Sequence, residues 1–534
     1  MEQALLIQGG TVIDGTGGGA VRADVRIENG QIEQIRPGLS PREGDRVLPA
    51  EGLAVCPGFI DAHCHTDMYA QDVPDACGKV MQGVTTDVCG LCGDSPAPVG
   101  TGHLEEFRKR REYRLPGGEP LRAVSFAEYA SRINRQGNST NMALFVGNSN
   151  LRVHAVGYQN RPATRAELDE MKGMLAESVA AGAFGLSTGL TYYPSQCASR
   201  EELIELCRAM APLGGIYNSH MRNEGDHVLE AIGEVVKIAQ ASGCRGHISH
   251  LKVSGRKNHG KAEQCLELIH AAQNRGVDIS FDVYPYTAGS CGLRTLLPPE
   301  LLEKGFERSH LLAADTLAQC RERLREGDWD NLLLSCGEEN IVLTAGPKEL
   351  EGKTIASIVR GAGLDEAEVL CRLLCRTKGQ GSIVYHALGE KDLLSFMRDP
   401  LCSIGTDAFA RNYTGPTAAG KPHPRNYGAF PRWFQHYVLE QKLFSLEEGV
   451  KKVTAVPAAQ FGLSGLGVLR EGRRADLTVF DPKAIRENGD FAQPNRAPNG
   501  VRYVVIQGRL AVEDGVFRPI HAGGVVSSRG TSSS

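Results

Sequence analysis

Short apolar runs that alternate with polar residues occupy both ends of the chain. Residues 4–7 and 501–506 are examples, and Gly-rich turns separate them from similar runs nearby. Alternation with a period of two is typical of strands with one buried face. Asn29-Gly30, which stands between two such runs, predicts a tight hairpin. Because neither end can bury a core alone, we expect residues 1–57 and 458–523 to pair into one small β-sandwich domain.

Between the two ends, the pattern changes to strand-like runs that alternate with helical sequence. Thr164 and Glu167 have the spacing of a capping box and predict the start of a helix that stops near Gly182. Eight buried strands are predicted to start at Gly58, Thr85, Ala143, Ala183, Gly215, Gly246, Asp278 and Cys402. This succession predicts an α/β fold, a (β/α)₈ TIM-like barrel over residues 58–457, with a site at the carboxyl ends of its strands.

Two segments do not fit the repeating strand and helix pattern. The distance between the seventh and eighth predicted strands is far too long for one helix, so we expect residues 297–345 to form a small, partly helical insertion over the barrel mouth. Residues 524–534 are rich in Ser and Gly and are expected to form a flexible tail.

Composition and charge exclude several classes of protein. The 59 Lys and Arg nearly balance the 63 Asp and Glu, so no nucleic-acid partner is expected. The apolar runs are short and interrupted, so no membrane association is expected either. Fifteen cysteines are an odd number scattered along the chain, which is a poor disulfide framework. They favour a cytoplasmic protein whose thiols stay free or bind metal.

Potential metal ligands follow the first two predicted strands. His63 and His65 are two positions apart, so an extended backbone points both imidazoles the same way. Cys92 lies just past the second strand. A redox pair with Cys89 is the competing interpretation, but Gly93 and two prolines follow instead of the helix that would lower a thiol pKa.

Further candidates end later strands. His220 and His250 end the fifth and sixth strands, and Asp407 ends the eighth, whereas His247 lies earlier in its strand and is expected to be a packed core residue. Since the carboxyl ends of barrel strands meet at one rim, the ligand candidates are expected to converge there.

This set of residue types points to metal-assisted hydrolysis. Imidazole and thiolate are good Zn²⁺ ligands, and three of them leave a position for water. The metal lowers the pKa of that water from about 15.7 towards about 7. A nearby carboxylate can move the proton to a leaving nitrogen. The residues alone leave an amide, an ester and a cyclic imide open as substrates.

Longer motifs surround these positions. They are Pro57-Gly-Phe-Ile-Asp-Ala-His-Cys-His, Gly90-Leu-Cys-Gly-Asp-Ser-Pro-Ala-Pro, Gly185-Leu-Ser-Thr-Gly-Leu-Thr-Tyr-Tyr-Pro, Ile248-Ser-His-Leu-Lys, Asp282-Val-Tyr-Pro-Tyr-Thr-Ala-Gly-Ser and His423-Pro-Arg-Asn-Tyr-Gly. With these motifs, nearly the whole chain resembles the amidohydrolase superfamily of metal-dependent barrels. Within that superfamily it is most similar to the N-acyl-D-amino-acid deacylases, or D-aminoacylases.

The resemblance implies a function and a role for each candidate residue. The implied reaction is zinc-dependent hydrolysis of a small N-acyl-D-amino acid to a carboxylate and a free D-amino acid, and a homo-oligomer is one open option. The implied roles are a tight Zn²⁺ site at Cys92, His220 and His250, a weaker or empty second site at His63, His65 and Asp407, a general acid/base at Asp407, and a substrate-carboxylate site at Lys252, Tyr284, Ser290 and Arg425.

Two alternatives stay open at this point. The first is a cyclic amidase similar to hydantoinase or dihydroorotase. Such relatives carry a carboxylated Lys at the end of strand four, whereas residues 185–190 here contain no Lys. The second is a catalytically inactive barrel kept as a scaffold, although such proteins usually lose ligands that this chain retains.

Overall fold

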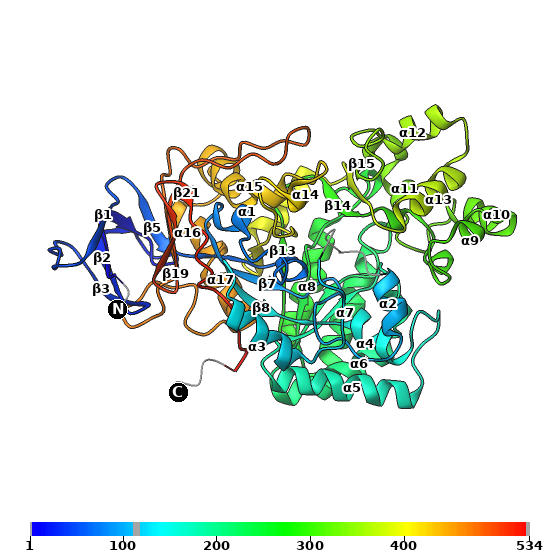
Figure 1. Ribbon diagram of the computed structural model, residues 1–534, viewed down its shortest axis with the longest axis horizontal. Coiled ribbons are helices and arrows are strands. Elements are labelled where there is room, and N and C mark those ends of the chain that lie inside the picture. The colour runs from blue at the N-terminus through cyan, green and yellow to red at the C-terminus, as the bar shows by residue number, and fades with distance from the viewer. Residues whose placement is uncertain (1–2, 111–117, 530–534) are drawn as a thin grey trace.

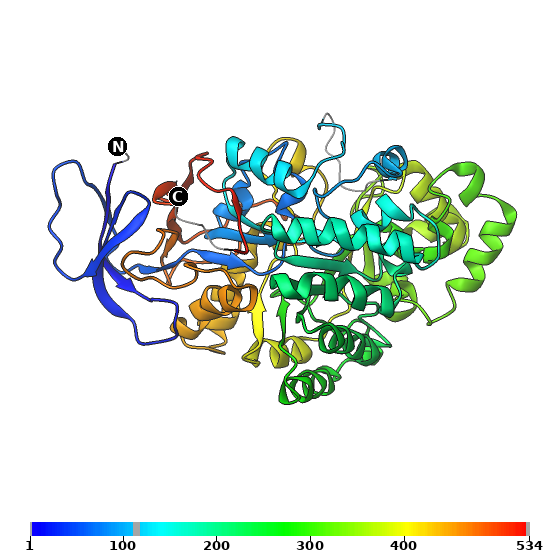
Figure 2. The same cartoon turned by 90° about the horizontal axis from the view of Figure 1, so that it is seen from below.

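Three regions follow one another along the long axis of the molecule (Figure 1). A computed structural model describes residues 3–110 and 118–529. A β-sheet domain from both ends of the chain lies at one side, a group of parallel strands and helices lies in the middle, and a largely helical insertion lies at the far side (Figures 1 and 2).

The β-sheet domain confirms that the two chain ends form one unit. Its described strands form one continuous sheet in which β5 and β18 join the two ends, with Val55 opposite Val479. At the predicted hairpin, Asn29 and Gly30 both have the positive φ that a tight turn requires. The strands are β1 Leu5–Val12, β2 Val21–Glu28, β3 Gln31–Arg36, β4 Arg46–Pro49, β5 Ala54–Pro57, β18 Leu477–Phe480, β19 Val501–Ile506, β20 Arg509–Glu513 and β21 Val516–Phe517.

The middle region is built on parallel strands that lie where the apolar runs predict them. They are β6 Phe59–Asp61, β7 Val84–Cys89, β8 Asn141–Leu144 with its continuation β9 Val146–Gly147, β10 Gly185–Gly189, β11 Ile216–His220, β12 Arg245–Ile248, β13 Ile279–Val283 and β17 Cys402–Ile404. Neighbours pair in parallel in chain order. The ring closes where the backbone N–H of Ala62 donates to the carbonyl of Ile404 at 3.4 Å.

Helices cover the outside of this ring (Figure 2). The predicted capping box is present at the start of α5. The Thr164 side chain accepts from the backbone N–H of Glu167, and the Glu167 side chain accepts from the backbone N–H of Thr164. α7 buries residues at helical spacing, among them Val228, Ile232 and Val235. The helices are α1 Cys77–Val80, α2 Leu104–Arg110, α3 Phe126–Gln136, α4 Asn148–Ala155, α5 Arg165–Ala180, α6 Arg200–Met210, α7 Val228–Ser242, α8 Ala262–Asn274, α14 Glu390–Arg398, α15 Arg425–Arg432, α16 Leu446–Lys452 and α17 Ala455–Phe461.

The insertion between β13 and β17 is wider than the predicted 297–345. Its three antiparallel strands, in the order β14-β16-β15, and five α-helices pack around a hydrophobic core that also includes Val153 and Tyr193 of the middle region. Residues 355–385 carry helix and strand patterns like those of the ring, so the sequence pattern alone does not separate them from it. The elements are β14 Gly289–Gly292, α9 Arg308–Leu311, α10 Ala314–Arg323, α11 Leu332–Cys336, β15 Ile341–Ala345, α12 Ile355–Ala362, α13 Glu366–Thr377 and β16 Ser382–Tyr385.

The boundaries near the carboxyl end also differ from the prediction. The expected boundary at residue 458 falls inside α17, whose Phe461 packs with Ile60 of the ring. The expected flexible tail is wrong for residues 524–529, because Val525 and Val526 form β22, which pairs in parallel with β8. Residues 530–534 lie outside the described residues. Within the described ranges, no helix combines the length and apolar character that crossing a membrane requires.

Candidate metal centre

The side chains predicted to bind the tighter metal meet at the carboxyl ends of the parallel strands. Cys92 Sγ lies 3.3 Å from His250 Nε2 and 3.7 Å from His220 Nδ1, and these two nitrogens are 2.9 Å apart. Zn–S and Zn–N bonds of about 2.3 and 2.0–2.1 Å place tetrahedral ligand atoms about 3.3–3.6 Å from one another. The donor types and their separations therefore fit one zinc ion with a small adjustment of the two rings.

The residues predicted for the second metal lie beside the first set. His63 Nε2 is 3.3 Å from Cys92 Sγ, and Asp407 Oδ1 is 3.2 Å from His65 Nε2 and 3.8 Å from His63 Nε2. Ligand atoms of His63, Cys92, His250 and Asp407 all lie within 4.8 Å of one another. Cys92 thus stands between both sets and can reach an ion in either.

The backbone is in an uncommon conformation at three of these residues. Cys92, His250 and Asp407 have φ values of 53°, 35° and 50°, in the left-handed region that costs a non-glycine residue about 1–3 kcal/mol. Hydrogen bonds hold two of them: the N–H of His250 donates to Asp282 Oδ1 at 3.0 Å, and the N–H of Asp407 donates to the carbonyl of His63 at 2.7 Å. Backbone strain of this kind is concentrated at functional sites.

Burial sets the protonation of these ligands. It lowers the pKa of His65 and His250 and lowers that of His220 well below its ordinary value, so the imidazoles are neutral and can bind a cation. Burial also raises the pKa of the Cys92 thiol well above its usual range. A metal ion must therefore displace the thiol proton when it binds.

Asp407 is charged despite its burial. Burial alone would raise its pKa, but Arg425 Nη1 lies 2.9 Å from Asp407 Oδ2, and the guanidinium, with the hydrogen bond from His65, holds the pKa of this carboxyl well below its usual range. A carboxylate is thus available next to the donor cluster.

Two of the four residues predicted to bind a substrate carboxylate, Lys252 and Arg425, lie against the ring of a third, Tyr284. Lys252 Nζ and Arg425 Cζ lie 5.5 and 4.8 Å from its centroid. The Tyr284 hydroxyl is buried and has no hydrogen-bond partner among the described residues. Ser290 is next to them, since its backbone carbonyl accepts from Arg425 Nη2 at 3.2 Å. The arrangement offers several donors to one anion.

Two buried acids support the site and were not predicted. Glu224 Oε1 lies 2.7 Å from Lys252 Nζ and 3.1 Å from His250 Nδ1. Asp282 Oδ2 lies 3.0 Å from His247 Nε2 and 3.5 Å from His63 Nδ1. His247 is therefore a buried partner of Asp282 and not a candidate metal ligand. Signals existed for both acids: Glu224 stands four residues after His220, and Asp282 is the last residue but one of the seventh strand.

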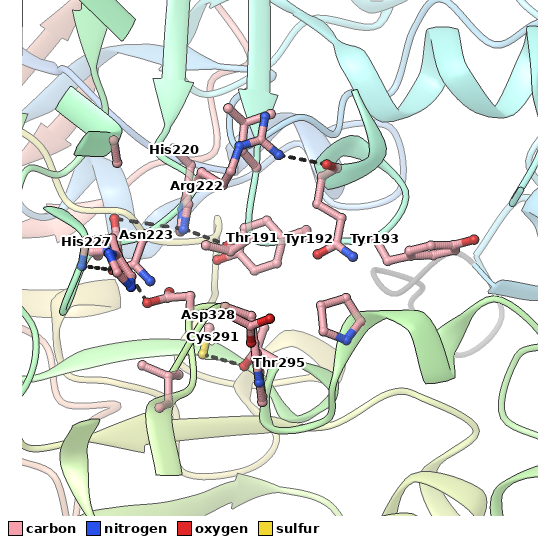
Figure 3. Close-up of a pocket in the computed structure, with 18 of the residues that line it drawn as sticks. Thr191, Tyr192, Tyr193, His220, Arg222, Asn223, His227, Cys291, Thr295 and Asp328 are labelled. Atoms are coloured by element: carbon pink, nitrogen blue, oxygen red, sulfur yellow. Dashed lines mark hydrogen bonds and ion pairs between the residues drawn. The ribbon is translucent and has the colours of Figure 1, made fainter. Parts of the chain in front are cut away.

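Two cavities border the cluster. The larger, about 550 Å³, lies between residues of the strand ends, such as Thr191 and His220, and residues of the insertion, such as Thr295 and Asp328 (Figure 3). The smaller, about 240 Å³, is lined by Cys92, His65, Asp407, Arg425 and Ser290. Tyr192, Tyr193, Cys291 and Arg294 line both. Together they suit a small ligand held against the metal ligands.

Residues 404–512 match the family described as "Amidohydrolase family". The chain is 33% identical to the D-aminoacylase of Alcaligenes xylosoxydans xylosoxydans, and the similarity covers 98% of this chain and 97% of that protein. It is 34% identical to the N-acyl-D-glutamate deacylase of the same organism, with 94% and 92% of the two chains covered.

Solved structures show the same similarity. The N-acyl-D-glutamate deacylase of Bordetella bronchiseptica, complexed with zinc and a phosphonate inhibitor, superposes with a TM-score of 0.81 at 31% identity, covering 98% of this chain and 99% of that one. The L-hydantoinase of Arthrobacter aurescens reaches a TM-score of 0.56 at 17% identity, with 98% and 99% covered, which shows a shared fold alone.

Proposed function

Because this chain belongs to the amidohydrolase family, in the group of D-aminoacylase and the N-acyl-D-amino-acid deacylases, we propose that it hydrolyses N-acyl-D-amino acids to a carboxylate and a free D-amino acid. The observation that carries the proposal is the meeting of Cys92, His220 and His250 next to the Asp407 carboxylate. A scaffold without activity is not supported, since the predicted ligand set is complete.

Zinc is the metal that best suits the donor set. Cys92, His220 and His250 would hold a tightly bound ion, and His63, His65 and Asp407 would form a weaker second site. When bound, the metal supplies polarisation of the scissile carbonyl and an activated water. A solved D-aminoacylase structure reports one-metal activation and second-metal attenuation of a binuclear centre, and we propose the same division here.

Asp407 would act as the general acid/base. Its carboxylate is charged and so can take a proton from the attacking water and return it to the leaving nitrogen. In the free protein, Arg425 pairs with this carboxylate at 2.9 Å. A substrate carboxylate would compete for the same guanidinium, and Asp407 would then be released for proton transfer as the substrate binds.

The substrate carboxylate would lie among Lys252, Tyr284, Ser290 and Arg425. Support comes from the two cations at this place and from the Tyr284 hydroxyl, which has no partner in the described part of the chain. A free carboxylate is present in linear N-acyl amino acids. A cyclic amidase is less well supported, because β10 offers no Lys for carboxylation and the similarity to hydantoinases concerns the fold.

Three relatives whose names differ in the amino acid are about equally similar to this chain. D-aminoacylase, N-acyl-D-aspartate deacylase and N-acyl-D-glutamate deacylase are 33, 32 and 34% identical to this chain. Arg294 lines both cavities and would meet an acidic side chain there.

A substrate panel tests the proposal. Zinc-supplemented protein is incubated with N-acetyl-D- and N-acetyl-L-amino acids with apolar and acidic side chains, and the free amine is measured. We expect release from D-substrates and none after chelation of the metal. Ring opening of hydantoins without deacylation, or hydrolysis of L-substrates alone, would contradict the proposal.

A further inference from the structure

One buried carboxylate connects the candidate metal ligands to a candidate substrate-binding cation. Glu224 follows β11 and is 3% exposed. A single oxygen, Oε1, lies 2.7 Å from Lys252 Nζ, 3.1 Å from His250 Nδ1 and 3.9 Å from His220 Nε2. The carboxylate is therefore placed behind both imidazoles, on the side away from Cys92.

The position of Glu224 matters because a histidine can bind a metal through one ring nitrogen while the other carries the proton. His250 turns Nε2 towards Cys92 and Nδ1 towards Glu224. A proton on Nδ1 that is donated to Glu224 leaves the lone pair of Nε2 free for the metal. His220 is arranged in the same sense, with Nδ1 towards Cys92 and Nε2 2.9 Å from Thr191 Oγ1.

Lys252 makes the choice of tautomer depend on Glu224. Lys252 Nζ is also 2.7 Å from His250 Nδ1, and an ammonium group can donate but not accept. If Lys252 donates to Nδ1, the ring proton has to sit on Nε2, which faces the metal position. Glu224 offers an acceptor to both groups, so both can donate to it and the lone pair of Nε2 stays available.

The backbone of Glu224 is fixed on two sides. Its carbonyl accepts from the N–H of Ser254 at 2.7 Å, and its N–H donates to Asp330 Oδ1, in the insertion, at 3.4 Å. Burial alone would raise the pKa of Glu224, but the Lys252 ammonium and the hydrogen bond from His250 hold it well below its usual range. The group is therefore a charged acceptor in a fixed place.

We propose that Glu224 is a positioning residue that serves both halves of the site: it holds His250 in the tautomer that presents Nε2 to the metal, and it holds the ammonium of Lys252 beside Tyr284 for the substrate carboxylate. The part of this inference that concerns the substrate rests on the proposed function. The part that concerns zinc binding by His250 depends on the ligand geometry alone.

Glu224→Gln tests the proposal, because the amide keeps the size of the side chain and removes the charge. The exposed Glu263→Gln on α8 is the matched control. In a zinc competition with a chelator we expect Glu224→Gln to bind zinc about 10–100-fold more weakly, as for other groups that orient a metal-binding histidine. At saturating zinc we expect KM to rise at least fivefold with a smaller change in kcat. Glu263→Gln should match the wild type in both.

A second variant, Lys252→Met, separates the effect of Glu224 on substrate binding through Lys252 from its effect on zinc binding through His250. Lys252→Met should raise KM by itself, and adding Glu224→Gln to it should raise KM little further while zinc binding still weakens. If Glu224→Gln weakens zinc binding but leaves KM unchanged at saturating zinc, Glu224 acts on the metal alone and the coupling is wrong. If a folded Glu224→Gln protein keeps both wild-type values, the whole inference is wrong.

The result stays interpretable if the proposed function fails. Without turnover of any N-acyl-D-amino acid by the wild type, the substrate proposal is lost, but the zinc competition still decides the role of Glu224 towards His250. If thermal unfolding shows that Glu224→Gln does not fold, Glu224→Asp is measured instead. That variant keeps the charge but shortens the reach, so we expect a weaker effect in the same direction, and wild-type zinc binding and KM would overturn the inference.

Discussion

Two of the clusters of potential metal ligands among the described residues lie in the same ring of strands, and they differ in the position of their cation. In the first, Asp61, Cys64 and Asp87 bring their ligand atoms within 4.8 Å of one another. Lys79, which is fully buried, contacts Asp61 and lies 3.7 Å from Asp87 Oδ1 and 2.8 Å from Thr406 Oγ1. This cluster holds its own cation.

In the second cluster, Cys92, His63 and His250 face one another, and the nearby cations are already paired with acids beside them. Arg425 pairs with Asp407, and Lys252 pairs with Glu224. Among the described residues these cations lie at the edge of the cluster, Arg425 against Asp407 Oδ2 and Lys252 against His250 Nδ1, and not between the ligand atoms that face Cys92. Both clusters bring their ligand atoms within 4.8 Å of one another, but the first has no imidazole and encloses a lysine, and this internal lysine identifies it as a structural ion pair.

The largest effect is expected for removal of the shared thiolate. Cys92→Ala should lose the tightly bound zinc and with it the turnover, because two imidazoles alone hold a zinc ion weakly. Cys64→Ala, in the lysine-containing cluster, should keep full zinc stoichiometry. Metal analysis of the purified proteins checks both. Unchanged zinc in Cys92→Ala, or loss of zinc in Cys64→Ala, would reverse the comparison.

The next effect concerns Asp407. Asp407→Asn should lower kcat by a factor of about 10²–10⁴, the range usual for loss of a general acid/base, while the tight zinc stays bound. Steady-state kinetics and metal analysis of the same preparation check this. Normal activity in this variant removes Asp407 from proton transfer.

Lys79 gives the converse test in the structural cluster. Lys79→Met should lower the free energy of unfolding by about 3–5 kcal/mol, because it leaves buried carboxylates without a counter-ion. Urea unfolding measures the loss, with the exposed Lys237→Met as control. The folded fraction should still bind zinc at Cys92. A stable Lys79→Met protein would show that this cluster does not need its cation.

The smallest effect belongs to a buried acid whose cation is distant. Glu487 accepts from the Tyr286 hydroxyl at 2.5 Å, Arg432 lies 3.6 Å away, and burial raises the pKa of Glu487 to about 7. Between its unfolded pKa, about 4.3, and pH about 7, the native protein keeps a proton that the unfolded chain releases, so stability falls as pH rises.

Glu487→Gln removes this dependence. Relative to the variant, the wild type should lose about 1–3 kcal/mol of unfolding free energy between pH 5 and pH 8, measured by urea unfolding at both values. The exposed Glu263→Gln should show no such change. A difference that stays constant with pH would place the Glu487 pKa near its ordinary value.

The sequence predicts the strands of the fold and most of the candidate site, because most of the candidate site residues follow the ends of predicted strands. The apolar runs locate the parallel strands, and His220 and His250 can be placed at one rim because parallel strands end together. The structure then brings Cys92, His63, His65 and Asp407 to the same place, as that argument expects.

The supporting groups and the insertion could not be predicted in the same way. Glu224 acts through Lys252 and His250, which come from another strand, so its partners are set by packing and not by spacing. The insertion repeats the strand and helix patterns of the ring, and Val525-Val526 is too short a run to predict a strand without knowing that β8 has an open edge.

The left-handed backbone at Cys92, His250 and Asp407 has a consequence for evolution and engineering. Glycine adopts this conformation without penalty, so the residue that would suit the local chain best is one that carries no ligand atom. Selection for heat tolerance alone would thus favour loss of these ligand atoms, as it would favour glycine at the other residues with a positive φ. A variant library aimed at durability should keep these three codons constant and search the outer helices instead.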